Sequence, residues 1–207
     1  STTSVNLALA LKARGHRVGL LDADIYGPSI PRMMGLSGEP TSADGARIDA
    51  MEKFGIKCMS IGLLVDDDQA MVWRGPMATR ALVQIMQGVN WGELDILVVD
   101  LPPGTGDIQL TLVQQVPLLG SVIVSTPQDV ALVDAHKAMV MFDKVQVPNL
   151  GLVENMSFFL CPSCGEQADI FGHGGARRKA KDLGLDFLGE VPLHITIRET
   201  SDSGSPV

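Results

Sequence analysis

The chain has 207 residues, of which 45% are hydrophobic and only 4% aromatic. This length suits one α/β domain with a substantial core, and a mainly aliphatic interior is typical of sheets covered on both faces. The formal net charge of −8 argues against broad nucleic-acid binding, which requires a basic surface. No apolar run approaches the length of a membrane span, and no secretory signal is visible.

The two ends of the chain suggest the middle of a longer protein. The chain starts at Ser1 without an initiator Met, and an apolar run over 5–11 already predicts a helix that residues 1–4 would cap. Residues 200–207 are rich in Ser and Gly and predict a loop. We therefore expect one domain over 1–207, truncated at both ends.

In the first half of the chain, short apolar runs alternate with polar turns. In chain order we expect a turn at 14–16, a strand over 17–22, a loop at 26–31, a turn at 33–34, irregular chain over 37–53, a strand over 56–64, a solvated turn at 66–68 and a helix from Pro76 to about Gln87.

The second half repeats the alternation of strand and helix. We expect strands over 94–100, 121–125, 150–155 and 187–188, helices over 108–115, 128–142 and 174–183, a stiff loop at 102–107 and a cysteine loop at 161–164. Such alternation predicts an α/β fold, a doubly wound and mostly parallel sheet with helices on both faces.

Carboxylates and polar side chains follow three of the predicted strands, at 22–24, at Asp100 and at 154–155. In open parallel sheets, ligands bind outside the carboxyl ends of the strands. Asp100 after a buried strand suits a Walker B acid, which orients a Mg²⁺-bound water. Glycines in the loop 102–107 let backbone N–H groups approach a terminal phosphate. A capping Asp after a core strand is the competing interpretation of any one such strand.

The glycine-rich phosphate loop itself, G-x-x-x-x-G-K-[ST], does not occur in this sequence. However, the opening STTSVNLA resembles the last residues of the deviant Walker A motif in the Mrp/ApbC branch of the MinD/ParA-like P-loop ATPases. The resemblance runs the full length of the chain. It extends to bacterial Mrp/ApbC proteins and to the mitochondrial Ind-type factor. It rests on these strings: LLDADIYGPSIPRMMG (20–35), VWRGPM (72–77), LDILVVDLPPGTGD (94–107), VIVSTPQDVAL (122–132), GLVENMSFFLCPSC (151–164), IFGHGGAR (170–177) and GEVPLH (189–194).

The resemblance implies roles at the catalytic end of an ATP site. Ser1 matches the motif Ser that ligates Mg²⁺, and Thr2 matches a phosphate contact at a helix N-terminus. Asp24 matches the Asp of the first switch that positions the attacking water. Asp100 matches the Walker B acid, and Gly104 the second-switch glycine near the γ-phosphate.

Two further residues match positions near the base. Asn155 matches the residue that reads adenine through its amide, which offers both a donor and an acceptor. Pro192 lies in the segment that packs near the base. The family pattern places the first strand and the loop glycines and lysines before Ser1, so we expect 1–207 alone not to bind ATP properly.

Cys161 and Cys164 form a C-x-x-C pair, two thiols close enough to chelate one metal. A [4Fe–4S] cluster or a structural Zn²⁺ takes four ligands, so two thiols per chain point to a site completed by a second copy. Half of a zinc ribbon, a redox dithiol and a turn without metal remain open from the motif alone. The family resemblance implies a [4Fe–4S] cluster bridged by a homodimer.

Other residues carry less specific signals. Cys58 lies in an apolar strand pattern and is expected to be a buried small hydrophobe. His173 is either an alternative ligand or a helix-entry residue. Trp73 and Arg74 fit a hinge, a dimer contact or core packing. Lys137 is expected to be solvated, and the ten methionines are expected mainly to fill the core.

The leading hypothesis is an ATP-dependent carrier, a weak ATPase that binds a [4Fe–4S] cluster and transfers it to apo iron–sulfur proteins. Its expected location is the bacterial cytoplasm or, alternatively, the mitochondrial matrix. A positioning ATPase like MinD or ParA would need an amphipathic tail or a basic patch. A nitrogenase-reductase-like electron donor would have its ligand cysteines far apart in the chain.

Overall fold

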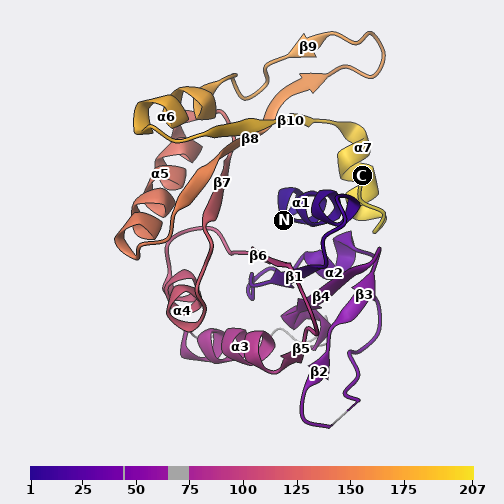
Figure 1. The fold of residues 1–207 in the computed structure, drawn as a ribbon. Helices are drawn as coiled ribbons and strands as arrows, with labels where there is room; N and C mark the ends of the chain where they lie inside the picture. Colours follow the sequence, from indigo (N-terminus) through magenta and orange to yellow (C-terminus); the bar gives the residue numbers. More distant parts are fainter. Residues whose placement is uncertain (44, 65–74) are drawn as a thin grey trace. The chain divides into compact units, whose positions relative to one another are not determined.

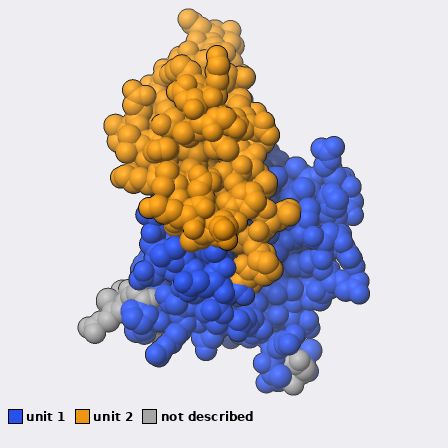
Figure 2. Space-filling view, turned by 60° about the vertical axis from the view of Figure 1, so that its left-hand side comes forward, with its two compact units in different colours: residues 1–115, 196–207 blue, residues 116–195 orange. Residues whose placement is uncertain are grey.

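The computed structural model describes residues 1–43, 45–64 and 75–207. Contacts divide the chain into two compact units, coloured separately in Figure 2: residues 1–115 with 196–207, and residues 116–195. Trp73 and Arg74, together with the predicted turn at 66–68, lie outside the described residues. The elements of both units are labelled in Figure 1.

The first unit contains a four-stranded sheet in the order β3-β4-β1-β6. Its strands are β1 (Val18–Asp22), β3 (Met51–Lys53), β4 (Ile56–Ser60) and β6 (Ile96–Asp100). β1 runs parallel to both β4 and β6, and β3 pairs with β4 antiparallel. Two further strands, β2 (Ile48–Asp49) and β5 (Val89–Asn90), form a separate parallel pair.

Helices of this unit connect and cover its strands. They are α1 (Thr2–Ala13), α2 (Ile30–Met33), the 3₁₀ turn η1 (Ile61–Leu63), α3 (Gly75–Gln87), α4 (Asp107–Gln115) and α7 (Ile195–Asp202), which starts at the last residue of the second unit. α1 lies against β1, β4 and β6, and α3 lies against α4. Helices therefore pack on the parallel strands that end at Asp22 and Asp100.

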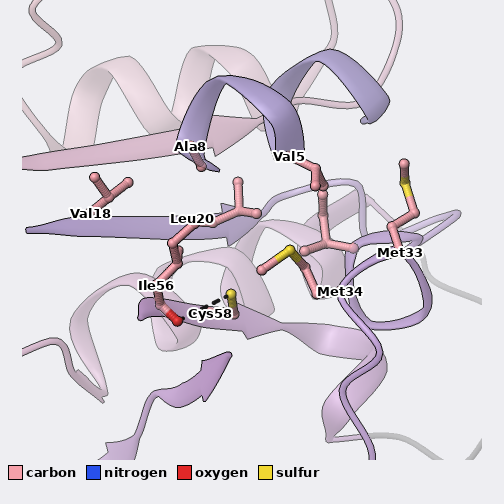
Figure 3. Packing of buried hydrophobic residues seen from close by; sticks show 9 residues of the cluster. Val5, Ala8, Val18, Leu20, Met33, Met34, Ile56 and Cys58 are labelled. Atoms are coloured by element: carbon pink, nitrogen blue, oxygen red, sulfur yellow. Dashed lines mark hydrogen bonds between the residues drawn. The ribbon is translucent and has the colours of Figure 1, made fainter. Parts of the chain in front are cut away.

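The core of the first unit lies between α1, α2 and the strands β1 and β4 (Figure 3). Nine residues form this buried cluster: Val5, Ala8, Val18, Leu20, Ile30, Met33, Met34, Ile56 and Cys58. Every residue of β1 is buried, which explains why residues 18–21 are all apolar instead of alternating with polar ones. Cys58 is fully buried, as expected.

Truncating Leu20, a fully buried member of this cluster, is expected to lower the free energy of unfolding by about 2–5 kcal/mol, because the deletion leaves a cavity among packed side chains. Leu7→Ala on α1 is the matched control, since Leu7 is 39% exposed, and should cost less than about 1 kcal/mol. Urea unfolding of Leu20→Ala and Leu7→Ala measures both values. Equal losses would contradict this assignment of the core.

The second unit contains a sheet in the order β10-β8-β7, with β9 paired to β8. Its strands are β7 (Ser121–Ser125), β8 (Asn149–Leu160), β9 (Gln167–Ala168) and β10 (Phe187–Leu193). β8 runs parallel to β7 and β10, and antiparallel to β9. Helices α5 (Asp129–Lys144) and α6 (Gly175–Leu183) pack against each other and against this sheet (Figure 1).

The predicted α/β class with mostly parallel strands is confirmed, and several boundaries are corrected. The predicted strand over 56–64 ends at Ser60, where the Ser60 hydroxyl accepts the N–H of Gly62 and starts the turn η1. The predicted turn at 33–34 is the end of α2. Irregular chain expected over 37–53 includes β2 and β3, and the strand expected over 150–155 continues to Leu160.

The C-terminal segment was expected to be a loop, but α7 extends to Asp202. The following turn packs closely on the turn after α2, because a Cβ at Gly204 would lie 2.5 Å from the Cα of Gly35. Gly204 also has φ +69°, a conformation that favours glycine. The Ser- and Gly-rich composition of this segment therefore belongs to a closely packed turn. Composition alone does not distinguish such a turn from an exposed loop.

Candidate functional site

The carboxyl ends of three parallel strands lie level at one edge of the first unit's sheet. Asp22 of β1 is in register with Ser60 of β4 and with Asp100 of β6. The N–H of Ala23 donates to the carbonyl of Asp100 at 2.8 Å, which links the two strand ends directly. Parallel pairing therefore brings together the first two of the three polar strand ends that the sequence indicated.

Asp100 is buried at this edge and accepts two short hydrogen bonds from the start of α1. The hydroxyls of Ser1 and Ser4 donate to its two carboxylate oxygens, each at 2.6 Å. Ser1 is the N-cap residue of α1, as expected, but no side-chain hydrogen bond caps this helix. Ser4 was not predicted at the site, although its spacing of three from Ser1 places both hydroxyls on one helix face.

Thr2 begins α1 next to Ser1 and is half-buried. The three residues Ser1, Ser4 and Asp100 thus form an oxygen-rich cluster, and oxygen ligands are those that Mg²⁺ prefers. The cluster fits a Mg²⁺ held between a hydroxyl and a carboxylate. The two hydrogen bonds from Ser1 and Ser4 to Asp100 fix the start of α1 relative to β6.

Asp22 is a second buried carboxylate that the sequence analysis noted only as part of a strand end. It accepts the backbone N–H groups of Asp24 and Ile30 and the hydroxyl of Ser60, each at 3.1 Å. These bonds tie both ends of the loop 24–30 to β1. Burial, opposed by the bond from Ile30 and reinforced by the nearby charge of Asp100, raises the pKa of Asp22 to about 6.

The raised pKa of Asp22 predicts a pH-dependent stability. Between its ordinary value of 3.8 and about 6, the folded state holds more protons than the unfolded state, so stability falls as the pH rises through this window. In metal-free and nucleotide-free protein, Asp22 should lower the free energy of unfolding by about 2 kcal/mol between pH 4 and pH 7. Urea unfolding of the parent and of Asp22→Asn across this range measures the difference in slope.

Asp95 provides a control of opposite sign. Its hydrogen bonds from Arg17 lower its pKa to about 2, so its stabilising contribution is present above pH 4 and is lost as the pH falls towards 2. Asp95→Asn should therefore leave the slope between pH 4 and pH 7 unchanged. If Asp22→Asn and Asp95→Asn show the same slope in that window, the assignment to Asp22 is wrong.

A pocket of about 420 Å³ opens beside this edge in the first unit. Its lining consists of Asp24, Tyr26 and Gly27 from the loop after β1 and of residues of the segment 102–109. Asp24 is half-buried and accepts the N–H of Gly27 at 3.2 Å. The structure therefore brings the two predicted switch segments together around one hollow.

The loop 102–106 owes its shape to a glutamine and a glycine. Gln109, which is buried on α4, donates to the carbonyls of Pro102 and Gly104 at 2.9 and 3.0 Å. Gly104 has φ +96°, and no atom lies within 4 Å of the position of a Cβ there. Backbone conformation therefore explains why a glycine stands at Gly104. Gln109 is a further site residue that the sequence analysis did not single out.

Asn155 and Pro192 belong to the second unit and lie on neighbouring strands. Asn155 of β8 is in register with Val191 of β10, directly before Pro192. Asn155 is half-buried. The predicted contact of both residues with an adenine base remains a prediction.

Glu154, next to Asn155, is fully buried and has four partners in the second unit. It accepts the hydroxyl of Ser157 at 2.6 Å and the N–H groups of Gly174 and Ala176 at 2.8 and 2.7 Å, and His173 Nδ1 lies 3.9 Å away. Burial raises the pKa of Glu154, but these hydrogen bonds outweigh burial and leave the pKa below its ordinary value. A buried carboxylate thus holds the start of α6 against β8.

Cys161 and Cys164 lie in the connection between the antiparallel strands β8 and β9. Cys161 donates its backbone N–H to Glu166 and accepts that of Gly165 at its carbonyl, at 2.9 and 2.8 Å, which closes a tight turn. Cys161 is half-buried and Cys164 is exposed. Hydrogen bonds from the backbone N–H groups of Cys164 and Ser163 lower the pKa of the Cys161 thiol.

A lowered pKa favours the thiolate, which is the form that binds metal. Cys58 is different, because burial raises the pKa of its thiol to about 12. Among residues 1–43, 45–64 and 75–207, no group of three His, Cys, Asp or Glu side chains is placed to hold a metal ion. The exposed turn presents two thiols, of Cys161 and Cys164.

Two other predicted features are also placed. Lys137 of α5 is exposed and pairs with Asp134 at 2.8 Å, in agreement with the expectation that it is solvated. His173 lies just before α6 and contacts the hydroxyl of Ser157 at 3.2 Å. None of the described helices is long and apolar enough to cross a membrane.

Parallel strands that end on Asp22 and Asp100, a helix start bound to Asp100 and a glycine-containing loop beside it are typical of nucleotide-binding α/β proteins. The whole chain, residues 1–207, matches the family described as ParA: NUBPL iron-transfer P-loop NTPase. The chain belongs to this family.

Relatives from bacteria and mitochondria match along the full chain. An iron–sulfur cluster carrier protein of Escherichia coli strain K12 is 57% identical over 207 residues, which are 100% of this chain and 56% of the relative. An iron–sulfur protein required for NADH dehydrogenase, mitochondrial, of Arabidopsis thaliana is 56% identical over 100% of this chain and 66% of its own length. The chain therefore spans little more than half of the Escherichia coli protein.

Solved structures agree on the fold. A nucleotide-binding protein from Archaeoglobus fulgidus in complex with ADP has a TM-score of 0.85 and 38% identity, and the match covers 99% of this chain and 80% of that one. The cell-division ATPase MinD of Pyrococcus furiosus has a TM-score of 0.69 at 18% identity, covering 99% and 82% of the two chains. The latter likeness shows the fold alone.

Proposed function

We propose that this chain is the ATPase part of a dimeric iron–sulfur carrier, which binds a [4Fe–4S] cluster between two copies and transfers it to apo iron–sulfur proteins. The observation that carries the proposal is the exposed turn with Cys161 and Cys164, in a family described as iron-transfer NTPases. The named carriers among its relatives support the same activity.

The number of cysteine ligands is the reason for proposing a dimer. Each copy provides the thiolates of Cys161 and Cys164, and two copies provide the four that a [4Fe–4S] cluster takes. Transfer is then a ligand exchange in which acceptor thiols lose their protons and replace the carrier's thiolates one after another. The iron and sulfide of the cluster keep their oxidation states, and the protons return to the carrier's cysteines or to water.

The first unit would provide a slow ATPase. In this proposal Ser1 and Asp100 hold Mg²⁺, Asp24 positions the water that attacks the γ-phosphorus, and Thr2 and Gly104 contact the phosphates. The bond between the γ-phosphorus and its bridging oxygen breaks, and ADP and phosphate leave. Proximity of Asp24 to the loop 102–106 around one pocket supports this assignment.

Asn155 and Pro192 would contact adenine. The bacterial and mitochondrial relatives favour a reducing compartment, and we propose the bacterial cytoplasm with the mitochondrial matrix as the alternative. Reduced thiols are required in either compartment if two chains are to share one cluster.

Anaerobic reconstitution of the full-length protein tests the proposal. We expect four iron and four acid-labile sulfide per two chains, a native mass of a dimer, and transfer of the cluster to an apo-acceptor. Stoichiometric zinc in place of iron, or a cluster bound by a monomer, would overturn the proposed function as a dimeric iron–sulfur carrier. A cluster that passes electrons but never moves to an acceptor would favour an electron donor instead.

A further inference from the structure

Strand β8 contains an irregularity between the residue proposed to read adenine and the cysteine turn. Its pairing with β10 runs from Asn155 opposite Val191 to Phe159 opposite Leu193, so β8 has two more residues in this interval than β10. Met156 has φ +53°, which is rare and strained for a residue with a side chain. Residues 156–158 are therefore a bulge, named here the β8 bulge.

The strand opposite the bulge is adapted to it. Pro192 lies between the two paired residues of β10 and has no N–H for a regular ladder. Proline within sheets is confined to edge strands and bulges, and β10 is an edge strand. Hydrogen bonding across the bulge is thus limited, and other groups must hold its conformation.

Glu154 and His173 hold the bulge from the side of α6. Ser157, fully buried in the bulge, donates to Glu154 at 2.6 Å, and the same carboxylate receives the N–H groups of Gly174 and Ala176. His173 contacts the Ser157 hydroxyl at 3.2 Å, and its ring forms a T-shaped pair with that of Phe158, with centroids 6.4 Å apart. Two consecutive bulge residues are therefore anchored to the helix start.

The position of the bulge matters because β8 continues directly into the cysteine turn. β8 ends at Leu160, and Cys161 follows at once. A bulge bends its strand and redirects the residues that follow. The conformation at 156–158 therefore sets where the two thiols lie relative to α6 and the sheet of the second unit.

We propose that Glu154 and His173 are positioning residues, which lock the β8 bulge and so set the placement of the Cys161–Cys164 turn. The inference rests on the proposed function in so far as this placement governs how tightly a bridging cluster is held. Neither residue ligates iron. Their contribution passes through Ser157 and Phe158 to the strand that bears the cysteines.

Glu154→Gln in the full-length protein tests the carboxylate. A glutamine has one acceptor oxygen, so its NH₂ group must face the N–H of Gly174 in one orientation or the N–H of Ala176 in the other, and one of these two bonds is lost. Glu190→Gln is the matched control, because Glu190 is the residue of β10 paired with Glu154 and binds the exposed Arg177 instead. Both variants lose one negative charge on the same sheet.

The first readout is hydrogen exchange in metal-free protein. In Glu154→Gln the amides of 157–168 should exchange about tenfold faster, whereas Glu190→Gln should match the parent. The second readout is the loss of iron to a chelator from reconstituted protein, which should be about tenfold faster in Glu154→Gln with an unchanged iron content. Equal behaviour of Glu154→Gln and Glu190→Gln in the exchange of 157–168 would overturn the proposal.

His173 provides a second test that leaves the buried carboxylate of Glu154 in place, at a side chain that is itself 40% exposed. His173→Phe keeps a ring beside Phe158 but loses the nitrogen that faces Ser157, and should speed both the exchange of 157–168 and iron loss. His173→Asn restores a polar group there and should recover most of the effect. This pair also decides the question if Glu154→Gln does not fold.

The experiments distinguish failure of the proposed carrier function from failure of the proposed positioning role. If the parent protein binds no cluster, the carrier function fails, while faster exchange of 157–168 in His173→Phe still supports positioning. If His173→Phe binds no iron although the parent does, His173 is a ligand and the positioning role is overturned. If His173→Phe and the parent exchange alike over 157–168, the bulge is not locked by His173 and the proposal is also overturned.

Discussion

Replacing Cys161 by Ala in the full-length protein is expected to abolish cluster binding, with iron content falling from four per dimer to background. Removing one thiol per chain would leave two of the four ligands at the proposed shared site, and a [4Fe–4S] cluster is not held by two thiolates. The Cys161 thiol also has the lowered pKa, so the variant loses the thiolate that the turn stabilises. Iron and sulfide analysis after anaerobic reconstitution measures the loss.

Cys58→Ala is the matched control for this prediction. Cys58 lies fully buried in the core of the first unit, and its thiol has a pKa of about 12. This variant should bind the full four iron per dimer and should lose only the stability that a small core truncation costs. Iron binding that survives in Cys161→Ala, or that is lost in Cys58→Ala, would contradict the assignment of the cluster ligands.

Asp100→Asn is expected to reduce ATP hydrolysis by the full-length protein at least about 100-fold, because the site would lose the charge that we propose holds Mg²⁺ and its bound water. Asparagine has the shape of aspartate, and the hydroxyls of Ser1 and Ser4 accept hydrogen bonds as well as donate them. The fold should therefore remain intact. Steady-state phosphate release at saturating Mg²⁺ and ATP measures the change.

Asp95→Asn tests whether the effect is specific to the carboxyl end of β6. Asp95 directly precedes the same strand at its other end and binds the exposed Arg17. Because exposed ion pairs contribute little, this variant should hydrolyse ATP at the parent rate. A comparable fall in Asp95→Asn, or an unchanged rate in Asp100→Asn, would place the catalytic carboxylate elsewhere.

Most helices and strands were predictable because their sequences carry local signals. The strand at 121–125 was predicted with its observed bounds, and α3 starts beside the proline that marks a helix entry. Boundaries failed where a distant contact decided them. β8 continues five residues beyond the predicted end because it pairs with β9, and a local pattern does not report that pairing.

Among the residues of the candidate site, some were predictable from local sequence signals and others were not. Asp24, Asp100 and Gly104 were identified from strand ends, a glycine-rich loop and the family motifs that contain them. Ser4, Asp22, Gln109 and Glu154 were not assigned roles, because each acts through hydrogen bonds to partners distant in the sequence or in an adjacent loop. A buried carboxylate gives no signal of its burial in the sequence.

The sequence by itself determined the α/β class, the family resemblance and the pair of cysteines, since these depend on residue order and short spacings. The cysteine motif remained open between iron, zinc and redox chemistry until the family resemblance was added. Only the tertiary structure decided that Ser1 and Ser4 bind Asp100, and that Glu154 joins the β8 bulge to α6. Those contacts form because parallel strands and packed helices bring together residues up to 99 positions apart.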